Sequence, residues 1–176
     1  PLINFGASAG HVGMRVYEKN GLNMSDVLAG PKPEGIKGWM TAITYFFTDA
    51  DTALADSLYE EATDEELATL REMLSADLEA GALGIGLPLD YFSEAIQGAE
   101  MRMIFATAAQ YTAPIFVHIR RGIDGDPSGL TEVIDLAREY GAAVHICHIS
   151  HNAISNLELF LAEVRQAQEE GIDITT

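Results

Sequence analysis

The stretch PIFVHI, residues 114–119, decides the fold class of this 176-residue chain. It is a short apolar run of strand length. From residue 82 onward such runs start about every thirty residues, with a helical pattern in each gap. The runs are LINF (2–5), ALGIGL (82–87), PIFVHI (114–119), AAVHIC (142–147) and IDITT (172–176). Strands and helices that alternate at this spacing predict βαβ units and a parallel sheet, an α/β fold.

Helix signals fill the gaps between these runs. Two segments begin with a capping-box pattern and three end at a glycine. The residues are Thr63 with Glu66, Ser155 with Glu158, and Gly81, Gly141 and Gly171. The sequence predicts further helices over 99–111 and 129–140.

A parallel sheet with such connections belongs either to an open, doubly wound fold or to a (β/α)8 barrel. In both folds, ligands bind beyond the carboxyl ends of the strands. A complete barrel needs about 250 residues, so five strands would form about half of one. The chain starts with PLINFG and stops on GIDITT, and we interpret both ends as cuts through a larger fold.

Residues 17–62 do not follow the alternation of short strands and helices. Their first part is rich in Gly, Pro and Asn, which predicts a loop, and their second part mixes aromatic and small residues in a way that suits a helix. We interpret 17–62 as an insertion after the first strand. The alternative is a helix packed on the outside of the barrel.

The charge balance excludes several classes of partner. The 27 acidic and 10 basic residues give a net charge of −17, which argues against binding nucleic acid or an anionic membrane. No apolar run approaches the ~18 residues of a membrane span, and no signal peptide opens the chain. The single cysteine, Cys147, cannot form an internal disulfide. We therefore expect a cytoplasmic globular protein.

Two histidines follow neighbouring predicted strands and are candidate metal ligands. His118 and His148 lie thirty residues apart, each at the carboxyl end of its strand, so a parallel sheet brings them together. Imidazole suits Zn, Fe, Ni or Cu, and a catalytic zinc site has three protein ligands and an open position. The alternative is that each histidine bonds only a loop backbone.

Strand alternation separates His148 from its neighbours in the sequence. If His148 points into a barrel, Val144 and Ile146 should do so too, whereas His145 and Cys147 should point toward the helices. His151 lies beyond the strand, in a loop that faces substrate or solvent. His11, in the glycine-rich FGASAGHVG, is a weaker candidate at another strand end.

Four segments resemble the N-acyl-D-amino-acid deacylase (D-aminoacylase) group of the amidohydrolase superfamily. They are INFGASAGHVGMR (3–15), ATDEELATLREMLSADLEAGALGIGLPLDY (62–91), PIFVHIRR (114–121) and AAVHICHIS (142–150). They are similar to the group's GH-x-x-x-R, GALGLSTGL-x-Y, THIR and ISH-x-K patterns. The resemblance covers residues 1–16 and about 62–176, in the same order and spacing.

The resemblance implies a zinc-dependent hydrolase of carbon–nitrogen bonds other than peptide bonds, built on a (β/α)8 TIM-type barrel. It implies that His118 and His148 bind one or two divalent ions and that Tyr91 lies at the substrate site. In such enzymes a metal-activated water attacks the amide carbonyl, and an aspartate after the eighth strand is the base. Residues 1–176 would then be the central part of one barrel domain, about its third to seventh strands.

The chain departs from the group at the residue that contacts the substrate carboxylate. Ser150 stands where the group often has a lysine, so Arg120 or Arg121 could take over this contact. Of the substrates, an N-acyl-D-amino acid such as N-acyl-D-glutamate is favoured over cyclic amides. The group's first-strand H-x-H pair, bridging cysteine and eighth-strand aspartate would lie outside 1–176, so we expect these residues alone to be inactive.

These observations lead to one main hypothesis and two alternatives. The main hypothesis is a metal-dependent amidohydrolase that acts on a small N-acyl amino acid. The first alternative is a non-catalytic half-barrel or binding module, and the second is an amidohydrolase that acts on a cyclic amide. The exposed strand edges of a cut barrel would also allow chains to pair into a homo-oligomer.

Overall fold

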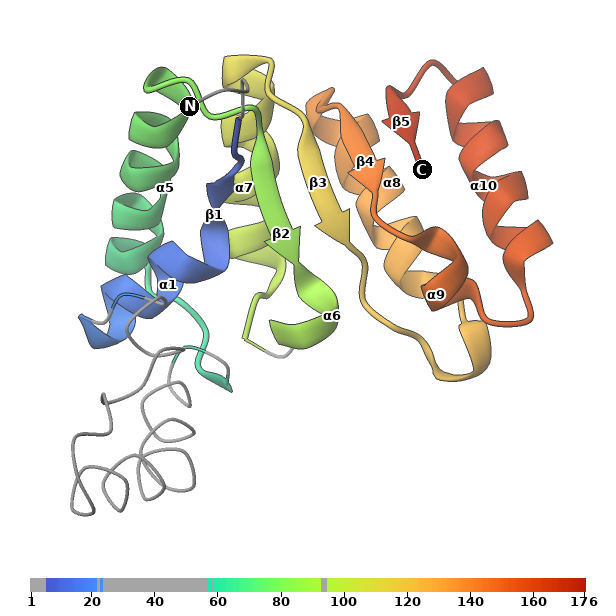
Figure 1. Ribbon diagram of the computed structural model, residues 1–176, viewed down its shortest axis with the longest axis horizontal. Helices are drawn as coiled ribbons and strands as arrows, with labels where there is room; N and C mark the ends of the chain where they lie inside the picture. The colour runs from blue at the N-terminus through green and yellow to red at the C-terminus, as the bar shows by residue number, and fades with distance from the viewer. Residues whose placement is uncertain (1–5, 22, 24–56, 58, 93–94) are drawn as a thin grey trace, which may run out of the picture.

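The computed structural model describes residues 6–21, 23, 57, 59–92 and 95–176 (Figure 1). The predicted first strand, LINF at 2–5, lies outside the described residues. So does most of the predicted insertion at 17–62. Within that segment, helix α1 (His11–Asn20) continues through Asn20 and ends at Gly21, whose φ of 66° closes the helix. The regular structure therefore extends four residues further than the sequence suggests, and the insertion itself stays a prediction.

In the described part of the chain, five parallel strands form one sheet, and their order in space is their order in the sequence. The strands are β1 (Ala9–Gly10), β2 (Ile85–Pro88), β3 (Ile115–His118), β4 (Val144–Ile146) and β5 (Ile174–Thr175). A doubly wound sheet reverses its strand order at a switch point, whereas a barrel wall does not. The observed order is therefore that of a (β/α)8 barrel wall, and the predicted α/β fold class is confirmed.

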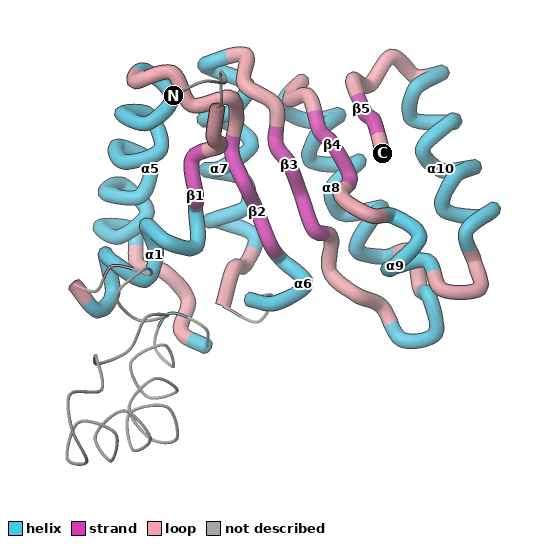
Figure 2. Tube along the Cα trace, in the orientation of Figure 1, coloured by secondary structure: helices cyan, strands magenta, loops and turns pink. Residues whose placement is uncertain are grey.

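The long helices connect successive strands and lie together on one face of the sheet (Figures 1 and 2). They are α5 (Asp64–Glu79), α7 (Gly98–Tyr111), α8 (Ser128–Tyr140) and α10 (Leu157–Glu169). Short helical segments follow the carboxyl ends of the strands, namely α6 (Leu89–Phe92), η2 (Ile123–Gly125) and α9 (Ile149–Ala153). No helix in the described part of the chain has the length and apolarity needed to cross a membrane.

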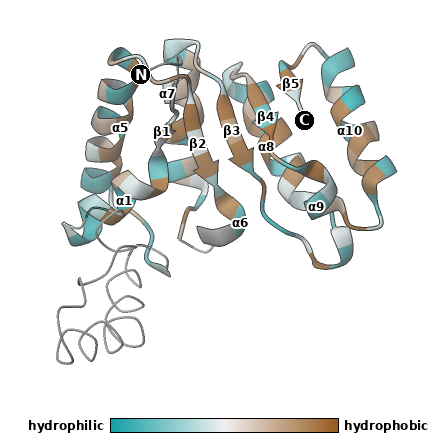
Figure 3. Cartoon of the chain, in the orientation of Figure 1, coloured by the Kyte–Doolittle hydropathy of each residue, from teal (hydrophilic) through white to brown (hydrophobic). Residues whose placement is uncertain are grey.

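The core lies between the sheet and the long helices. Alternate strand residues are fully buried there, for example Ile85, Ile115 and Val144, and they pack against helix residues such as Leu74 and Phe105. Each such side chain contributes roughly 1.5–3 kcal/mol through removal from water. Figure 3 shows the hydrophobic colour on the strands and hydrophilic colour on parts of α5 and α10.

The opposite face of the sheet is only partly covered by described residues. Phe116 pairs in register with His145, and both are half-buried. The Cys147 N–H donates to the Val117 carbonyl at 2.9 Å, which continues the β3–β4 pairing for one residue past β4. In a closed (β/α)8 barrel, the face opposite the helices is the packed interior.

The predicted orientation of β4 is therefore wrong. Val144 and Ile146 are buried on the helix side, whereas His145 and Cys147 are half-buried on the face that carries Phe116. The reason is that β4 ends at Ile146, so the alternation does not extend to His148. His148 has left-handed backbone angles, φ 38° and ψ 53°, which change the direction of its side chain.

The two predicted capping boxes have different outcomes. At α5 the box is present, because the Glu66 N–H donates to Thr63 Oγ1 and the Thr63 N–H donates to Glu66 Oε2. At α10 it is absent, because the helix begins at Leu157 with Asn156 as its N-cap. The Asn156 amide instead donates to two carbonyls of η2, which fixes the turn one residue after Ser155.

Candidate functional site

The two candidate ligand histidines lie side by side at the carboxyl ends of β3 and β4. His118 is the last residue of β3, and His148 is the residue before α9. Their ring centroids are 4.4 Å apart and the rings are nearly perpendicular, at 88°. The predicted proximity of these two side chains is confirmed. It follows from the parallel pairing of β3 with β4, which brings both strand ends to one edge of the sheet.

Local backbone structure holds His148 in this position. Its left-handed conformation costs an L-residue roughly 1–2 kcal/mol, so the surrounding contacts must favour it. One such contact comes from the buried Asn152 of α9, whose amide donates to the Ile119 carbonyl at 3.2 Å. This hydrogen bond fastens α9 to the end of β3 and so fixes both histidines relative to each other.

The surroundings of His118 keep its ring neutral. Burial lowers its pKa below the usual value of 6.5, and the neighbouring His148 lowers it further, while Asp90 has the opposite effect. A neutral imidazole has a free electron pair and is the form that binds metals. The site therefore presents His118 in the state that a metal ligand requires.

A second group of polar side chains borders the histidine pair. Arg121 Nη2 donates to Asp90 Oδ2 at 2.7 Å and also reaches His151 Nε2. Because a guanidinium only donates, the His151 Nε2 atom accepts this hydrogen bond. The His151 ring lies 5.7 Å from the His148 ring, so His151 connects Arg121 to the histidine pair.

The three other residues predicted to bind substrate lie in three different segments of the chain. Arg120 donates from Nε to Glu132 on α8 at 2.8 Å and from Nη2 to the Ile96 carbonyl. Ser150 is exposed on α9. Tyr91 lies within α6, after β2, and its side chain is outside the described part of the chain. The roles of all three in substrate binding stay predictions.

His11 lies in a buried cluster away from these residues. Its Nε2 lies 2.8 Å from Glu100 Oε1 on α7, and Arg15 contacts the other oxygen of the same carboxylate. Arg15 also donates from Nε to the Ser57 carbonyl at 2.8 Å. All three side chains are almost fully buried. His11 therefore contributes to a network between α1 and α7.

Sequence reasoning missed this network and the partner of Arg121. His11 and Arg15 are four residues apart on one helix, a spacing that places both side chains on one face. That spacing was the available signal, but it does not identify Glu100, which is 85 residues from Arg15. Asp90 follows β2 directly and so lies on the ligand side of a parallel sheet, a position that turn residues also occupy.

The histidine pair by itself supplies part of a metal centre. Among the described residues, no group of three or more His, Cys, Asp or Glu side chains could hold a metal ion. A catalytic zinc has three protein ligands, so His118 and His148 fit as two of them. The chemistry and spacing of this pair suit a divalent ion that receives further ligands from elsewhere.

Together, the strand order and the one-sided helices define part of a (β/α)8 barrel, with two histidines at neighbouring strand ends. No protein-family model matches the sequence. No curated protein matches it either.

Solved structures share this fold. N-acyl-D-glutamate deacylase from Bordetella bronchiseptica, crystallised with zinc and a phosphonate inhibitor, superposes with a TM-score of 0.57 and 20% identity, over 97% of this chain and 46% of that chain. A D-aminoacylase studied for its binuclear metal centre gives 0.58 and 18% over the same shares. A further D-aminoacylase structure gives 0.58 and 17%. This likeness establishes the fold, and the chain spans about half the length of these proteins.

Proposed function

We propose that this chain is part of a metal-dependent amidohydrolase that hydrolyses the amide bond of an N-acyl-D-amino acid, with N-acyl-D-glutamate as the favoured substrate. The observation that carries the proposal is the pair of His118 and His148, whose ring centroids are 4.4 Å apart at the ends of neighbouring parallel strands. The fold shared with an N-acyl-D-glutamate deacylase and D-aminoacylases supports the same class of reaction.

His118 and His148 would hold a divalent ion, and we propose zinc. When bound, the ion supplies a Lewis acid for the amide carbonyl and makes a water more acidic. The remaining ligands and the general base are proposed to come from sequence outside these 176 residues, as the resemblance to the deacylase group implies.

The chain's own residues would arrange the site around this ion. The lowered pKa of His118 keeps its ring neutral at neutral pH, and the backbone of His148 holds its ring against His118. The Arg121 side chain, supported by Asp90, would present positive charge to an anionic substrate. Tyr91 and Ser150, on the two short helices that follow β2 and β4, are proposed to border the substrate.

The test is the metal content and activity of the full-length natural protein and of its His148→Ala variant. His145→Ala is the matched control, because His145 lies three residues earlier and its Nδ1 is 2.9 Å from Thr175 Oγ1. We expect His148→Ala to lose bound zinc and more activity on N-acetyl-D-glutamate than the about 10- to 100-fold typical of outer-shell changes. His145→Ala should keep its metal.

Two results would contradict the proposal. A His148→Ala protein with the metal content and activity of the wild type would show that His148 is not a ligand. Faster hydrolysis of hydantoin or dihydropyrimidine rings than of linear N-acyl-D-amino acids would show that the substrate class is wrong.

A further inference from the structure

Arg121 has one guanidinium nitrogen engaged and two that remain available to donate. Both of its contacts with described residues, to Asp90 and to His151, use Nη2. Its Nε and Nη1 hydrogens meet no acceptor among the described residues, and the side chain is 45% exposed. An exposed guanidinium N–H of this kind can donate a charge-assisted hydrogen bond to a carboxylate.

Arg120 is engaged differently, although it precedes Arg121 directly. Its Nε donates to Glu132 and its Nη2 to the Ile96 carbonyl, so its guanidinium joins α8 to the loop after α6. The Arg120 backbone is fixed as well. A Cβ atom at Gly129 would lie 2.2 Å from the Arg120 carbonyl oxygen, so only glycine permits this approach. Of the two arginines, Arg121 is the one positioned to meet a ligand.

The chemistry of an N-acyl amino acid places its α-carboxylate close to the reacting atoms. Only the amide nitrogen and Cα separate the scissile carbonyl carbon from the carboxylate carbon. If the carbonyl lies at His118 and His148, the group that binds the α-carboxylate must border this pair. Arg121 meets this requirement, because it contacts His151 and the His151 ring is 5.7 Å from the His148 ring.

The negative charge of the molecule favours a cation such as Arg121 at a site for an anion. The chain carries a net charge of −17, and Asp90 adds a carboxylate beside His118. An anionic ligand would be repelled unless a positive group faced it directly. Asp90 is only 5% exposed, so it orients the guanidinium through Nη2 and leaves the Nε and Nη1 hydrogens for a second carboxylate.

We propose that Arg121, oriented by Asp90, is the specificity-determining residue that binds the α-carboxylate of the N-acyl amino acid. It takes the place of the lysine that resembling enzymes often carry at the position of Ser150. This inference rests on the proposed function and names the group that recognises the substrate.

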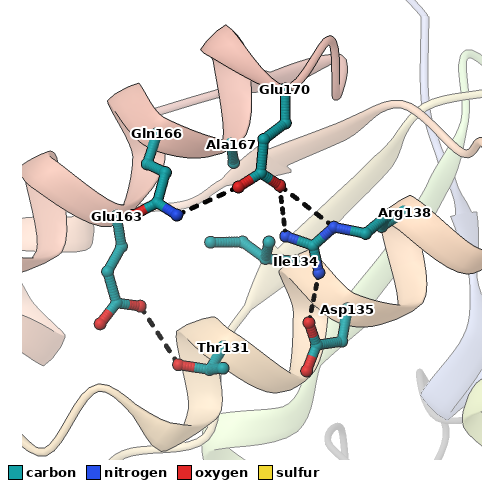
Figure 4. Close-up of a pocket in the computed structure, with 8 residues that line it drawn as sticks. All are labelled: Thr131, Ile134, Asp135, Arg138, Glu163, Gln166, Ala167 and Glu170. Atoms are coloured by element: carbon teal, nitrogen blue, oxygen red, sulfur yellow. Dashed lines mark hydrogen bonds and ion pairs between the residues drawn. The ribbon is translucent and has the colours of Figure 1, made fainter.

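The test compares N-acetyl-D-glutamate with N-acetyl-D-isoglutamine, whose α-carboxylate is replaced by a neutral amide, on the full-length protein. The variant is Arg121→Met, and Arg138→Met is the matched control. Arg138 is 46% exposed and pairs with Asp135 and Glu170, but it lies in the groove between α8 and α10 (Figure 4). Both variants remove one exposed, paired arginine.

We expect Arg121→Met to lower kcat/KM for N-acetyl-D-glutamate about 10- to 100-fold and to leave the isoglutamine nearly unchanged. Arg121→Lys should recover part of the loss, because it restores the charge but not the planar guanidinium that Asp90 orients. Arg138→Met should behave as the wild type. An equal loss for both compounds, or no loss, would overturn the inference.

Calorimetric binding of the same two compounds separates this inference from the proposed function. Binding of N-acetyl-D-glutamate that depends on Arg121, without hydrolysis by the wild type, would refute the function and support the carboxylate site. Hydrolysis that does not depend on Arg121 would refute only the site. A wild type that neither binds nor hydrolyses N-acetyl-D-glutamate would refute both.

Discussion

The backbone of His148 is strained in a way that a substitution can measure. Its φ of 38° lies in the region that glycine adopts freely and L-residues avoid. We predict that His148→Gly has an unfolding free energy about 1 kcal/mol higher than His148→Ala, because only alanine keeps the strain. Denaturant unfolding of the two metal-free variants measures this difference.

His145 provides the opposite comparison. It lies in β4, where glycine weakens a strand, so His145→Gly should be less stable than His145→Ala. If alanine were the better residue at both positions, the left-handed conformation of His148 would not be a source of strain.

The sequence predicted the meeting of His118 and His148, because parallel strands bring their carboxyl ends to one edge. It could not predict which face His145 and Cys147 share. The alternation rule holds only while residues stay in extended backbone, and nothing in AAVHICHIS marks Ile146 as the last of them. The turn at His148 depends on tertiary contacts such as the one between Asn152 and Ile119.

At the scale of elements, helix α5 depends on its capping box. Thr63 Oγ1 accepts from the Glu66 N–H, and the Glu66 carboxylate accepts from the Thr63 N–H at 2.7 Å. We predict that Thr63→Ala lowers the unfolding free energy by about 1 kcal/mol. Ser155→Ala is the control, because Ser155 has the same sequence pattern but the N-cap position of α10 is Asn156. Thermal unfolding of both variants checks this, and equal losses would contradict it.

The difference between these two helix starts shows why local patterns predict some element ends and not others. Both hydrogen bonds of the Thr63 cap join residues only three positions apart, so the local pattern contains both partners. Ser155 adjoins Asn156, whose amide binds η2, and follows Ile154, which has a φ of 51°. The contact with η2 joins residues more than thirty positions apart, so a capping pattern read over four residues does not include it.

At the scale of the molecule, the buried cluster of His11, Arg15 and Glu100 connects two helices that follow neighbouring strands. It connects α1, which follows β1, with α7, which follows β2. Burial raises the pKa of the Glu100 carboxyl, but the contacts with His11 and Arg15 outweigh this and hold the pKa below its usual value of 4.5. The ionised carboxylate is therefore the form that stabilises the fold.

The depressed pKa of Glu100 predicts how stability depends on pH. As the pH falls below about 4.5, the Glu100 carboxyl takes up a proton in the unfolded chain before it does so in the folded chain. The stabilisation from Glu100 is therefore complete above about pH 4.5 and decreases as the pH falls to the pKa of Glu100 in the folded protein. The slope attributable to this one proton reaches at most about 1.4 kcal/mol per pH unit. We expect Glu100→Gln to remove that contribution and to cost about 3–5 kcal/mol at neutral pH, since it leaves Arg15 buried without its counter-charge.

Glu170 is the control for this prediction, because its pKa is also lowered, mainly by hydrogen bonds from Arg138 and Gln166, but on the surface of α10. An exposed pair is screened by water and contributes little, so Glu170→Gln should change stability far less than Glu100→Gln. Denaturant unfolding of the wild type and both variants between acidic and neutral pH tests the contrast. Similar losses in the two variants would show that the buried cluster adds no more than a surface ion pair. A larger loss for Glu100→Gln, with a flatter pH dependence, would identify the cluster as a principal connection between α1 and the helix layer.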